Sequence, residues 1–423
     1  MEVKPGYKQT EVGVIPVEWD VIRLGELADM VTSGSRGWAR FYSERGALFV
    51  RSQNVRDVHL CLEDVQHVSP PVGAEGNRTK VRLGDLLITV TGNSVGNVAM
   101  VEQAFDEAYI SQHVGLVRLK EPKNVSFVCR YLSPGSPGNP QIAGSQSGQS
   151  KPGLNLQNLK DFLIALPRSQ NERQSVATAL SDIDDLIQSL ERLVAKKRDL
   201  KQAAMQQLLT GQTRLPGFSG EWEAKTLGDV VQCDSSGTYG LEKPVGDMVP
   251  MPVATTAQIT ADDKWNYKPM TKRFFYPRQL SEYCVEEGDL VVVKSSGSAA
   301  SIQSGKMVLI DENLAGSFLF SNFLMRLRPK ACDASFLYYY LTSSKVKAII
   351  PSVCEASTYP NIRINEYLEI AVPVPHEDEQ AAIAEVLSDM DTEITALEAR
   401  LAKTRDLKQG MMQELLTGRT RLV

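Results

Sequence analysis

The sequence contains no run of about 18 uncharged apolar residues, the length that a membrane-spanning helix requires. Its first residues also lack the apolar core of a signal peptide, so we expect a cytoplasmic protein without a membrane partner. The six cysteines form no Cys-X-X-Cys pair, and the four histidines show no ligand spacing with them. This pattern argues against a metal site and a disulfide framework.

Catalytic signatures are missing as well. We find no phosphate-binding Gly-X-X-X-X-Gly-Lys-Ser/Thr loop, no Gly-X-Gly-X-X-Gly after a strand, no nucleophile elbow and no His-Glu-X-X-His. Asn139-Pro-Gln-Ile departs from the Asn/Asp-Pro-Pro-aromatic motif of amino-methyltransferases. The sequence therefore predicts a chain without catalytic activity of its own.

Length and charge set two further limits. At 423 residues the chain exceeds one ordinary domain of about 100 to 200 residues. A net charge of −5 argues against a protein that coats nucleic acid, so any nucleic-acid site must be local.

The chain contains an internal repeat. Residues 172–215 match residues 379–422 without gaps at an offset of 207, with 25 identities over 44 positions by count. A weaker echo links Glu18-Trp19 to Glu221-Trp222, and Gly84-Asp85-Leu86 to Gly288-Asp289-Leu290. The order is therefore globular domain, helix, globular domain, helix. The expected boundaries are 1–168, 169–213, 214–375 and 376–423.

Each repeated segment has the period of a long helix with an apolar seam at heptad a and d positions. Ser169 and Glu172 form a potential capping box, and Gly211 and Gly418 are suited to ending the helices. Lysines or a threonine interrupt both seams at the same place, which favours pairing of the two helices over packing of each on its own domain. The predicted seam residues are Leu180, Ile183, Ile187 and Leu190 in the first helix and Leu387, Met390, Ile394 and Leu397 in the second.

The two globular domains carry short β-branched or aromatic runs separated by Gly, Ser, Asn and Pro, which predicts a mixed α/β fold with short strands and large loops. Their loops are rich in amide, guanidinium and aromatic side chains. Such groups can contact phosphates and form bidentate hydrogen bonds with the edges of guanine or adenine. Taken singly, each loop is more often an ordinary solvated turn. The candidate DNA contacts are Arg36, Arg40, Arg51, Gln53, Asn54, Asn93, Gln112, Lys151, Tyr239, Gln258, Lys272, Arg273, Lys294, Ser296, Asn322 and Tyr359.

Two divergent domains, each followed by a near-identical long helix ending in Leu-Leu-Thr-Gly, resemble the specificity subunit of Type I restriction-modification systems. The resemblance implies two target recognition domains, each reading one half of a bipartite double-stranded DNA target. It also implies that the two helices form an antiparallel coiled coil and dock two methyltransferase subunits.

By the same resemblance, this chain binds no cofactor. The methyltransferase subunits bind S-adenosylmethionine, and up to two restriction subunits use ATP with Mg²⁺. An alternative is a non-catalytic, two-headed scaffold that binds protein or RNA.

The resemblance predicts that the length of the helix pair sets the distance between the two half-sites. Adding about four residues near Lys196–Lys201, with a matching insertion in the second helix, lengthens the helix pair by roughly 6 Å. The nonspecific spacer between the half-sites should then grow by about one or two base pairs, because DNA rises about 3.4 Å per pair. Sequencing of methylated sites in cells provides the measurement. An unchanged spacer with full activity would refute this prediction.

Overall fold

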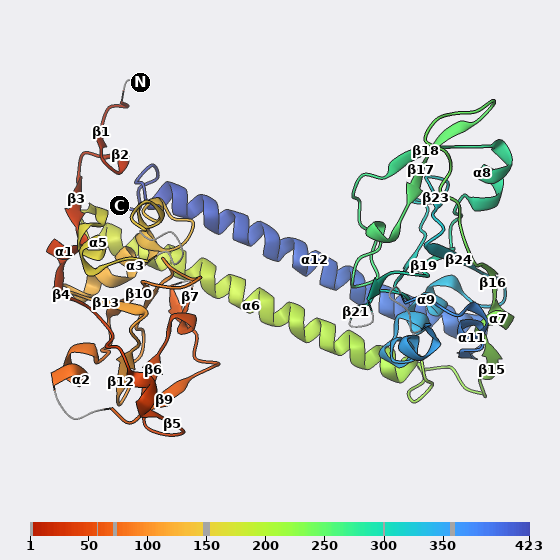
Figure 1. Cartoon of the computed structure of the whole chain (residues 1–423), viewed down its shortest axis with the longest axis horizontal. Coiled ribbons are helices and arrows are strands. Elements are labelled where there is room, and N and C mark those ends of the chain that lie inside the picture. The colour runs from red at the N-terminus through yellow and green to blue at the C-terminus, as the bar shows by residue number, and fades with distance from the viewer. Residues whose placement is uncertain (1–2, 57, 71–73, 147–152, 299–300, 356–359) are drawn as a thin grey trace. The chain divides into compact units, whose positions relative to one another are not determined.

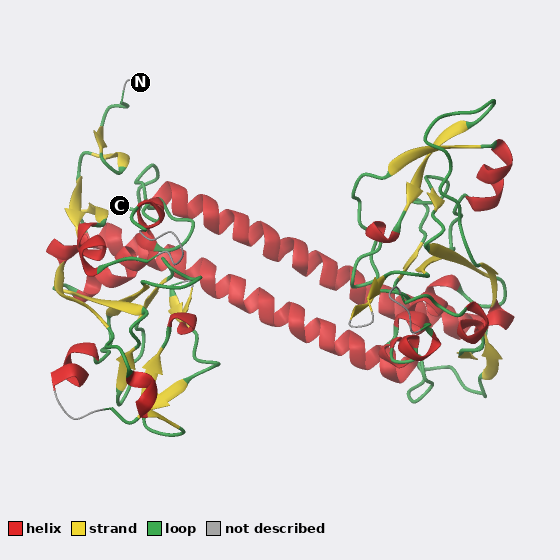
Figure 2. Cartoon of the chain, viewed as in Figure 1, coloured by secondary structure: helices red, strands yellow, loops and turns green. Residues whose placement is uncertain are grey.

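The computed structural model describes residues 3–56, 58–70, 74–146, 153–298, 301–355 and 360–423. The chain divides into two compact units, of which unit 1 comprises residues 1–191 and 399–423 and unit 2 comprises residues 192–398. Figure 2 shows short strands and long loops in both units. No helix of the described residues is long and apolar enough to cross a bilayer.

Unit 1 is a mixed α/β structure (Figure 1). Its strands are β1 (Tyr7–Thr10), β2 (Gly13–Pro16), β3 (Trp19–Arg23), β4 (Ala28–Ser33), β5 (Tyr42–Ser43), β6 (Ala47–Val50), β7 (Val55–Arg56), β8 (His59–Leu60), β9 (Gln66–Val68), β10 (Asp85–Thr89), β11 (Val98–Met100), β12 (Ala108–Ile110), β13 (Val114–Leu119) and β14 (Leu163–Pro167). Its short helices are α1 (Leu24–Leu27), α2 (Ala74–Thr79), α3 (Val125–Leu132), α4 (Pro140–Gly144) and α5 (Leu156–Asp161).

Unit 2 is built from a similar set of elements. Its strands are β15 (Glu223–Thr226), β16 (Val231–Asp234), β17 (Val249–Ala254), β18 (Thr271–Phe275), β19 (Leu290–Val293), β20 (Gly297–Ser298), β21 (Ser301–Ile302), β22 (Met307–Leu309), β23 (Leu319–Phe320), β24 (Leu324–Pro329) and β25 (Ala371–Val374). Its short helices are α7 (Leu227–Val230), α8 (Pro277–Tyr283), α9 (Ala334–Thr342), α10 (Ser344–Lys347) and α11 (Ile364–Leu368).

The sheets of the two units have matching strand orders. The four-stranded order β11-β10-β13-β4 in unit 1 corresponds to β22-β19-β24-β16 in unit 2. A second sheet contains one parallel pair in each unit, β6 with β12 and β17 with β23. A two-stranded sheet joins the start of each domain to the strand before its long helix, β3 with β14 and β15 with β25. The weak sequence echo thus reflects one repeated topology.

The Gly-Asp-Leu echo has a structural cause. Asp85 accepts two hydrogen bonds from Arg118, both at 2.7 Å, and Asp289 accepts two from Arg328 at 2.7 and 2.8 Å. The preceding glycines have φ values of +81° and +83°, which a residue with a Cβ rarely adopts. Each central strand therefore follows a left-handed glycine and starts beside a buried aspartate that pairs with a partly exposed arginine of the neighbouring strand.

The two long helices are α6 (Gln170–Leu208) and α12 (Glu377–Leu415). Gly211 and Gly418 both have φ of +69°, so the expected left-handed stops are confirmed. The Ser169 hydroxyl accepts the Glu172 amide at 3.3 Å, which is one half of the expected capping box. The Glu172 carboxylate binds Arg421 instead of completing the box.

The predicted seam residues are buried or half-buried. Leu180, Ile183, Leu190, Leu387 and Ile394 are buried, and the others are half-buried: Ile187, Met390 and Leu397. In each unit the seam also enters the core of the adjacent domain. Residues of α6 and α12 share one apolar cluster with domain residues in unit 1, including Leu180, Leu415 and Phe127. A second cluster in unit 2 includes Met205, Leu387 and Phe336.

Within each unit, segments of α6 and α12 run antiparallel and are joined by ion pairs. In unit 1 these pairs are Glu172 with Arg421, Asp184 with Lys408 and Glu191 with Arg405. In unit 2 they are Arg214 with Glu379, Lys201 with Asp391 and Arg198 with Glu398. Each of these three unit 2 pairs is a unit 1 pair shifted by the repeat offset of 207, with the two helices exchanged. The lysines that interrupt the seam, Lys201 and Lys408, therefore have matching carboxylate partners.

The ion pairs at the helix starts predict that replacing Arg421 lowers the stability of the protein much more than replacing the nearby Arg419. Replacing Arg421 with alanine leaves the Glu172 carboxylate, whose side chain is 1% exposed, without its cation. An unpaired buried charge is costly, so we expect a loss of about 3 kcal/mol in the free energy of unfolding. Urea denaturation monitored by circular dichroism measures this loss.

Arg419→Ala serves as the matched control. Arg419 is 63% exposed and lies 3.6 Å from Glu414, so its loss should cost less than about 1 kcal/mol. Equal denaturation midpoints for the two variants would contradict the structural role of the Arg421 pair.

Candidate nucleic-acid interface

In each unit four loops follow the ends of neighbouring strands, and main-chain hydrogen bonds link them. We name them loops A to D and call the side of the sheets where they lie the loop edge. In unit 1, loop A is 34–37, loop B is 90–95, loop C is 111–113 and loop D is 51–54. In unit 2 they are 235–240, 294–296, 321–323 and 255–258. Loops A and B directly follow β4 and β10 in unit 1, and β16 and β19 in unit 2.

Backbone hydrogen bonds hold loop C to its neighbours in unit 1. The Ser111 amide donates to the Val50 carbonyl, which precedes loop D, at 2.8 Å. The His113 carbonyl accepts the Val90 amide of loop B at 2.9 Å. The main chain therefore fixes loop C at both ends, whatever its side chains are.

Unit 2 repeats these bonds at corresponding positions. The Ser321 amide donates to the Ala254 carbonyl at 2.9 Å, and the Phe323 carbonyl accepts the Lys294 amide at 2.9 Å. In loop A the Thr238 amide donates to the Phe320 carbonyl at 2.9 Å. The two domains thus share one backbone arrangement while their loop sequences differ.

A glycine allows loop A to approach loop C closely in both units. A Cβ on Gly34 would lie 2.2 Å from the Ser111 carbonyl carbon, and one on Gly237 would lie 1.9 Å from the Phe320 carbonyl oxygen. Both neighbours are main-chain atoms, so a side chain at either position would force the loops apart.

Most of the predicted contact residues lie in these loops with exposed or partly exposed side chains. In unit 1 they are Arg36, Arg51, Gln53, Asn93 and Gln112, and in unit 2 they are Tyr239, Lys294, Ser296 and Asn322. Three lie outside the loops, namely Arg40 in the 3₁₀ helix η1 (Trp38–Phe41) and Lys272 and Arg273 in β18. Lys151 and Tyr359 fall outside the described residues.

Several of these side chains already have partners within the chain. Arg51 and Gln53 both bind the Asp64 carboxylate. Arg273 binds Glu242 at 2.8 Å and stacks over Tyr239, with its guanidinium carbon 4.7 Å from the ring centroid. These contacts orient the groups. Asn93, Gln112 and Asn322 are exposed amides at the loop edge, and Gln112 bonds to the His113 ring at 3.1 Å.

Asn54 and Gln258 are buried, with side chains that cap short helices. Asn54 accepts the Arg51 amide at 2.9 Å and Gln258 accepts the Thr255 amide at 2.9 Å, closing the 3₁₀ helices η2 (Ser52–Asn54) and η4 (Thr256–Gln258). The Asn54 amide group also donates to two backbone carbonyls. We therefore assign both residues to holding loop D and do not retain them as base contacts.

Partial burial changes the pKa of one charged side chain in the loops. Burial lowers the pKa of Lys294, whose ammonium donates to the Ser235 carbonyl at 3.0 Å and so links loops A and B. Two loop C residues that the sequence analysis did not list, His113 and Phe323, are exposed beside Gln112 and Asn322. The matched triplets Ser-Gln-His and Ser-Asn-Phe could have identified both positions.

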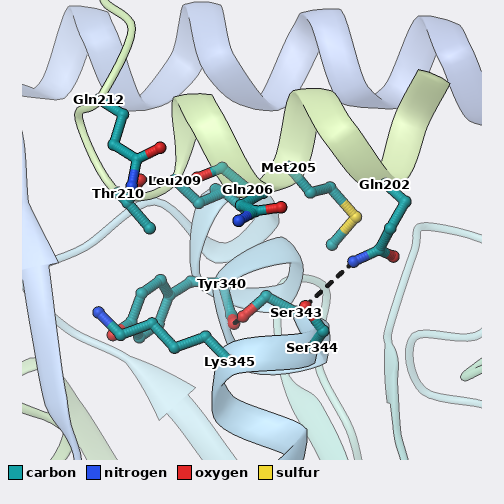
Figure 3. A pocket seen from close by; sticks show the side chains of 10 residues that line it. All are labelled: Gln202, Met205, Gln206, Leu209, Thr210, Gln212, Tyr340, Ser343, Ser344 and Lys345. Carbon is teal, nitrogen blue, oxygen red and sulfur yellow. Dashed lines mark hydrogen bonds between the residues drawn. The ribbon is translucent and has the colours of Figure 1, made fainter. Parts of the chain in front are cut away.

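A separate pocket of about 450 Å³ lies in unit 2 between α6 and α9–α10 (Figure 3). Gln202 of α6 donates to the Ser344 hydroxyl across it at 3.1 Å. In unit 1 the residues that correspond to Gln202 and Gln206 are Gln409 and Gln413, and both donate to the Gly135 carbonyl, at 2.9 and 3.0 Å. This pocket belongs to the junction of helix and domain.

The protein-family model of the Type I restriction modification DNA specificity domain matches residues 16–196 and 219–404. The chain belongs to this specificity-subunit family. It is 22% identical over 439 residues to the Type I restriction enzyme MjaVIII specificity subunit of Methanocaldococcus jannaschii, covering 96% of this chain and 94% of that one.

Solved Type I structures have the same fold. The S subunit from M. genitalium aligns over 98% of both chains with a TM-score of 0.60 and 15% identity. A chain from a structural study of complex assembly and conformational transition in a Type I system aligns over 96% of this chain and 99% of that one, with a TM-score of 0.55 and 20% identity. Members of the specificity-subunit family act in DNA target recognition, and the chain shares their mixed α/β fold of two domains.

The loop arrangement of this specificity subunit predicts that Gly237→Ala loosens loops A and C. The added Cβ displaces the Phe320 carbonyl, so the amides of Thr238 and Ser321 should exchange hydrogen faster than in the original protein. Hydrogen exchange with mass spectrometry measures both amides.

Gly144→Ala is the matched control, because a Cβ there has no atom within 4 Å and the backbone has no left-handed φ. Its exchange should match that of the unaltered chain throughout loops A to D. Unchanged exchange in Gly237→Ala would show that the close approach does not hold the loops.

Proposed function

We propose that this chain is the non-catalytic DNA-recognition subunit of a Type I restriction-modification complex, in which each domain reads one half of a bipartite target. The main support is the matched four-loop edge, with loop backbones bonded alike and side chains that differ between the units. A fixed backbone with varied side chains is what two readers of different sequences require.

Two classes of contact are proposed at this edge. Exposed arginines and lysines, among them Arg36, Arg40 and Lys272, contact phosphates and supply affinity without sequence preference. The exposed amides of Asn93, Gln112 and Asn322 read base edges, since an amide pairs bidentately with adenine in the major groove.

We propose that α6 and α12 form an antiparallel coiled-coil spacer and dock two methyltransferase subunits. The repeated ion pairs support this role, because the pairs of unit 1 recur in unit 2 with the two helices exchanged. The two units would therefore offer similar surfaces to two copies of one partner. The domain boundaries proposed for this assembly remain 1–168, 169–213, 214–375 and 376–423.

Catalysis and cofactors are assigned to the partners. The methyltransferase subunits would bind S-adenosylmethionine, and restriction subunits, where present, would use ATP with Mg²⁺. Burial raises the pKa of Cys233 to about 11 and of Cys332 to about 12, so these thiols are neutral near pH 7 and are poor nucleophiles. Among the described residues no group of three His, Cys, Asp or Glu side chains could hold a metal ion.

The proposal predicts that the two domains act independently on specificity. Gln112→Ala in unit 1 should relax base preference in one half-site, and Asn322→Ala in unit 2 should relax it in the other. Each change should cost about 1 to 3 kcal/mol of discrimination at one base pair. Mapping of methylated adenines in cells that express each full-length variant with its methyltransferase subunits measures both effects.

A cell lacking this chain provides the baseline for the map. If sequence-specific adenine methylation does not depend on the chain, the proposed function is wrong, and a scaffold for protein or RNA becomes the better explanation. If either variant alters both halves together, the domains are not separate readers.

A further inference from the structure

Phe323 places an exposed apolar ring on a firmly held backbone. Its side chain is 53% exposed and joins none of the apolar clusters found among the described residues. Its carbonyl oxygen accepts two amides of loop B, from Lys294 at 2.9 Å and Ser295 at 3.3 Å. The ring therefore projects from a fixed point of the loop edge. Its burial in a complex would remove apolar surface from water, which is favourable.

The neighbouring side chain indicates what this ring would meet. Asn322 is also exposed, and its carbonyl accepts the Ser236 hydroxyl of loop A at 3.5 Å. An amide pairs bidentately with the N6 and N7 atoms of adenine, which are presented together only in the major groove. In that groove the apolar group on a base edge is the 5-methyl group of thymine.

We propose that Phe323 is a specificity-determining residue that contacts the methyl group of a thymine in the half-site of unit 2, beside an adenine read by Asn322. This inference rests on the proposed function of the chain. The corresponding residue of unit 1, His113, has a polar ring bonded to Gln112 and Thr91, so unit 1 lacks this methyl contact.

The test replaces each thymine of the unit 2 half-site in turn with deoxyuridine, which lacks only the methyl group. Binding of the full chain with its methyltransferase subunits is measured by fluorescence anisotropy on each duplex. We expect the original complex to lose about three- to tenfold in affinity at one thymine, as fits the loss of one buried methyl contact. The Phe323→Ala complex should bind the thymine and deoxyuridine duplexes equally.

Tyr267→Ala is the matched control, since Tyr267 is 80% exposed in the same unit but lies outside loops A to D. This variant should keep the full sensitivity to the missing methyl group. Thermal unfolding of Phe323→Ala should match that of the original chain, because the ring makes no core contact.

Two results would overturn the inference: an original complex that tolerates deoxyuridine at every position, or a Phe323→Ala complex that keeps the methyl sensitivity. Failure of the proposed function itself looks different. In that case the original complex binds its target and a scrambled duplex with equal affinity, so no half-site exists to be read.

Discussion

Both units depend on one contact, in which the start of each long helix forms an ion pair with an arginine that follows the end of the other long helix. Glu172 and Glu379 are almost fully buried, and each needs the arginine that follows the other helix, Arg421 or Arg214. A buried carboxylate without a cation is strongly unfavourable, so neither helix can shift in register without breaking this contact. The Glu379 carboxylate also accepts the Trp222 indole at 3.1 Å, which links the helix start to the domain core of unit 2.

The domains combine this fixed base with variable loops. Buried strand pairs and the Asp85–Arg118 and Asp289–Arg328 contacts anchor the central strands, and the loops extend from the strand ends. Because main-chain bonds hold loop C in both units, the side chains at its tip can change without loss of the loop conformation. Sequence divergence in the domains is therefore compatible with a conserved fold.

Much of the helical frame could be predicted from sequence, because a repeat and a heptad period are visible in one chain. The glycine stops and the polar seam positions followed from the same pattern, and Lys201 and Lys408 proved to have carboxylate partners. The loop residues were harder to assign, since the amide that suits a base also suits a backbone N–H. Asn54 and Gln258 use theirs to cap short helices, and no local pattern separates them from the exposed Asn93 and Asn322.

One polar position in the seam is satisfied differently in the two copies of the repeat. Lys197 binds Glu393 in unit 2, but the positions shifted by the repeat offset are Thr404 and Leu186. There the Thr404 hydroxyl donates to the Arg400 carbonyl and Leu186 is exposed, so unit 1 has no charge at either position. Lys197 and Glu393 are both partly exposed, so their pair contributes at most about 1 kcal/mol and unit 1 is stable without it. A polar residue in the seam can therefore be satisfied either by an ion pair across the helices or, as at Thr404, by a hydrogen bond within its own helix.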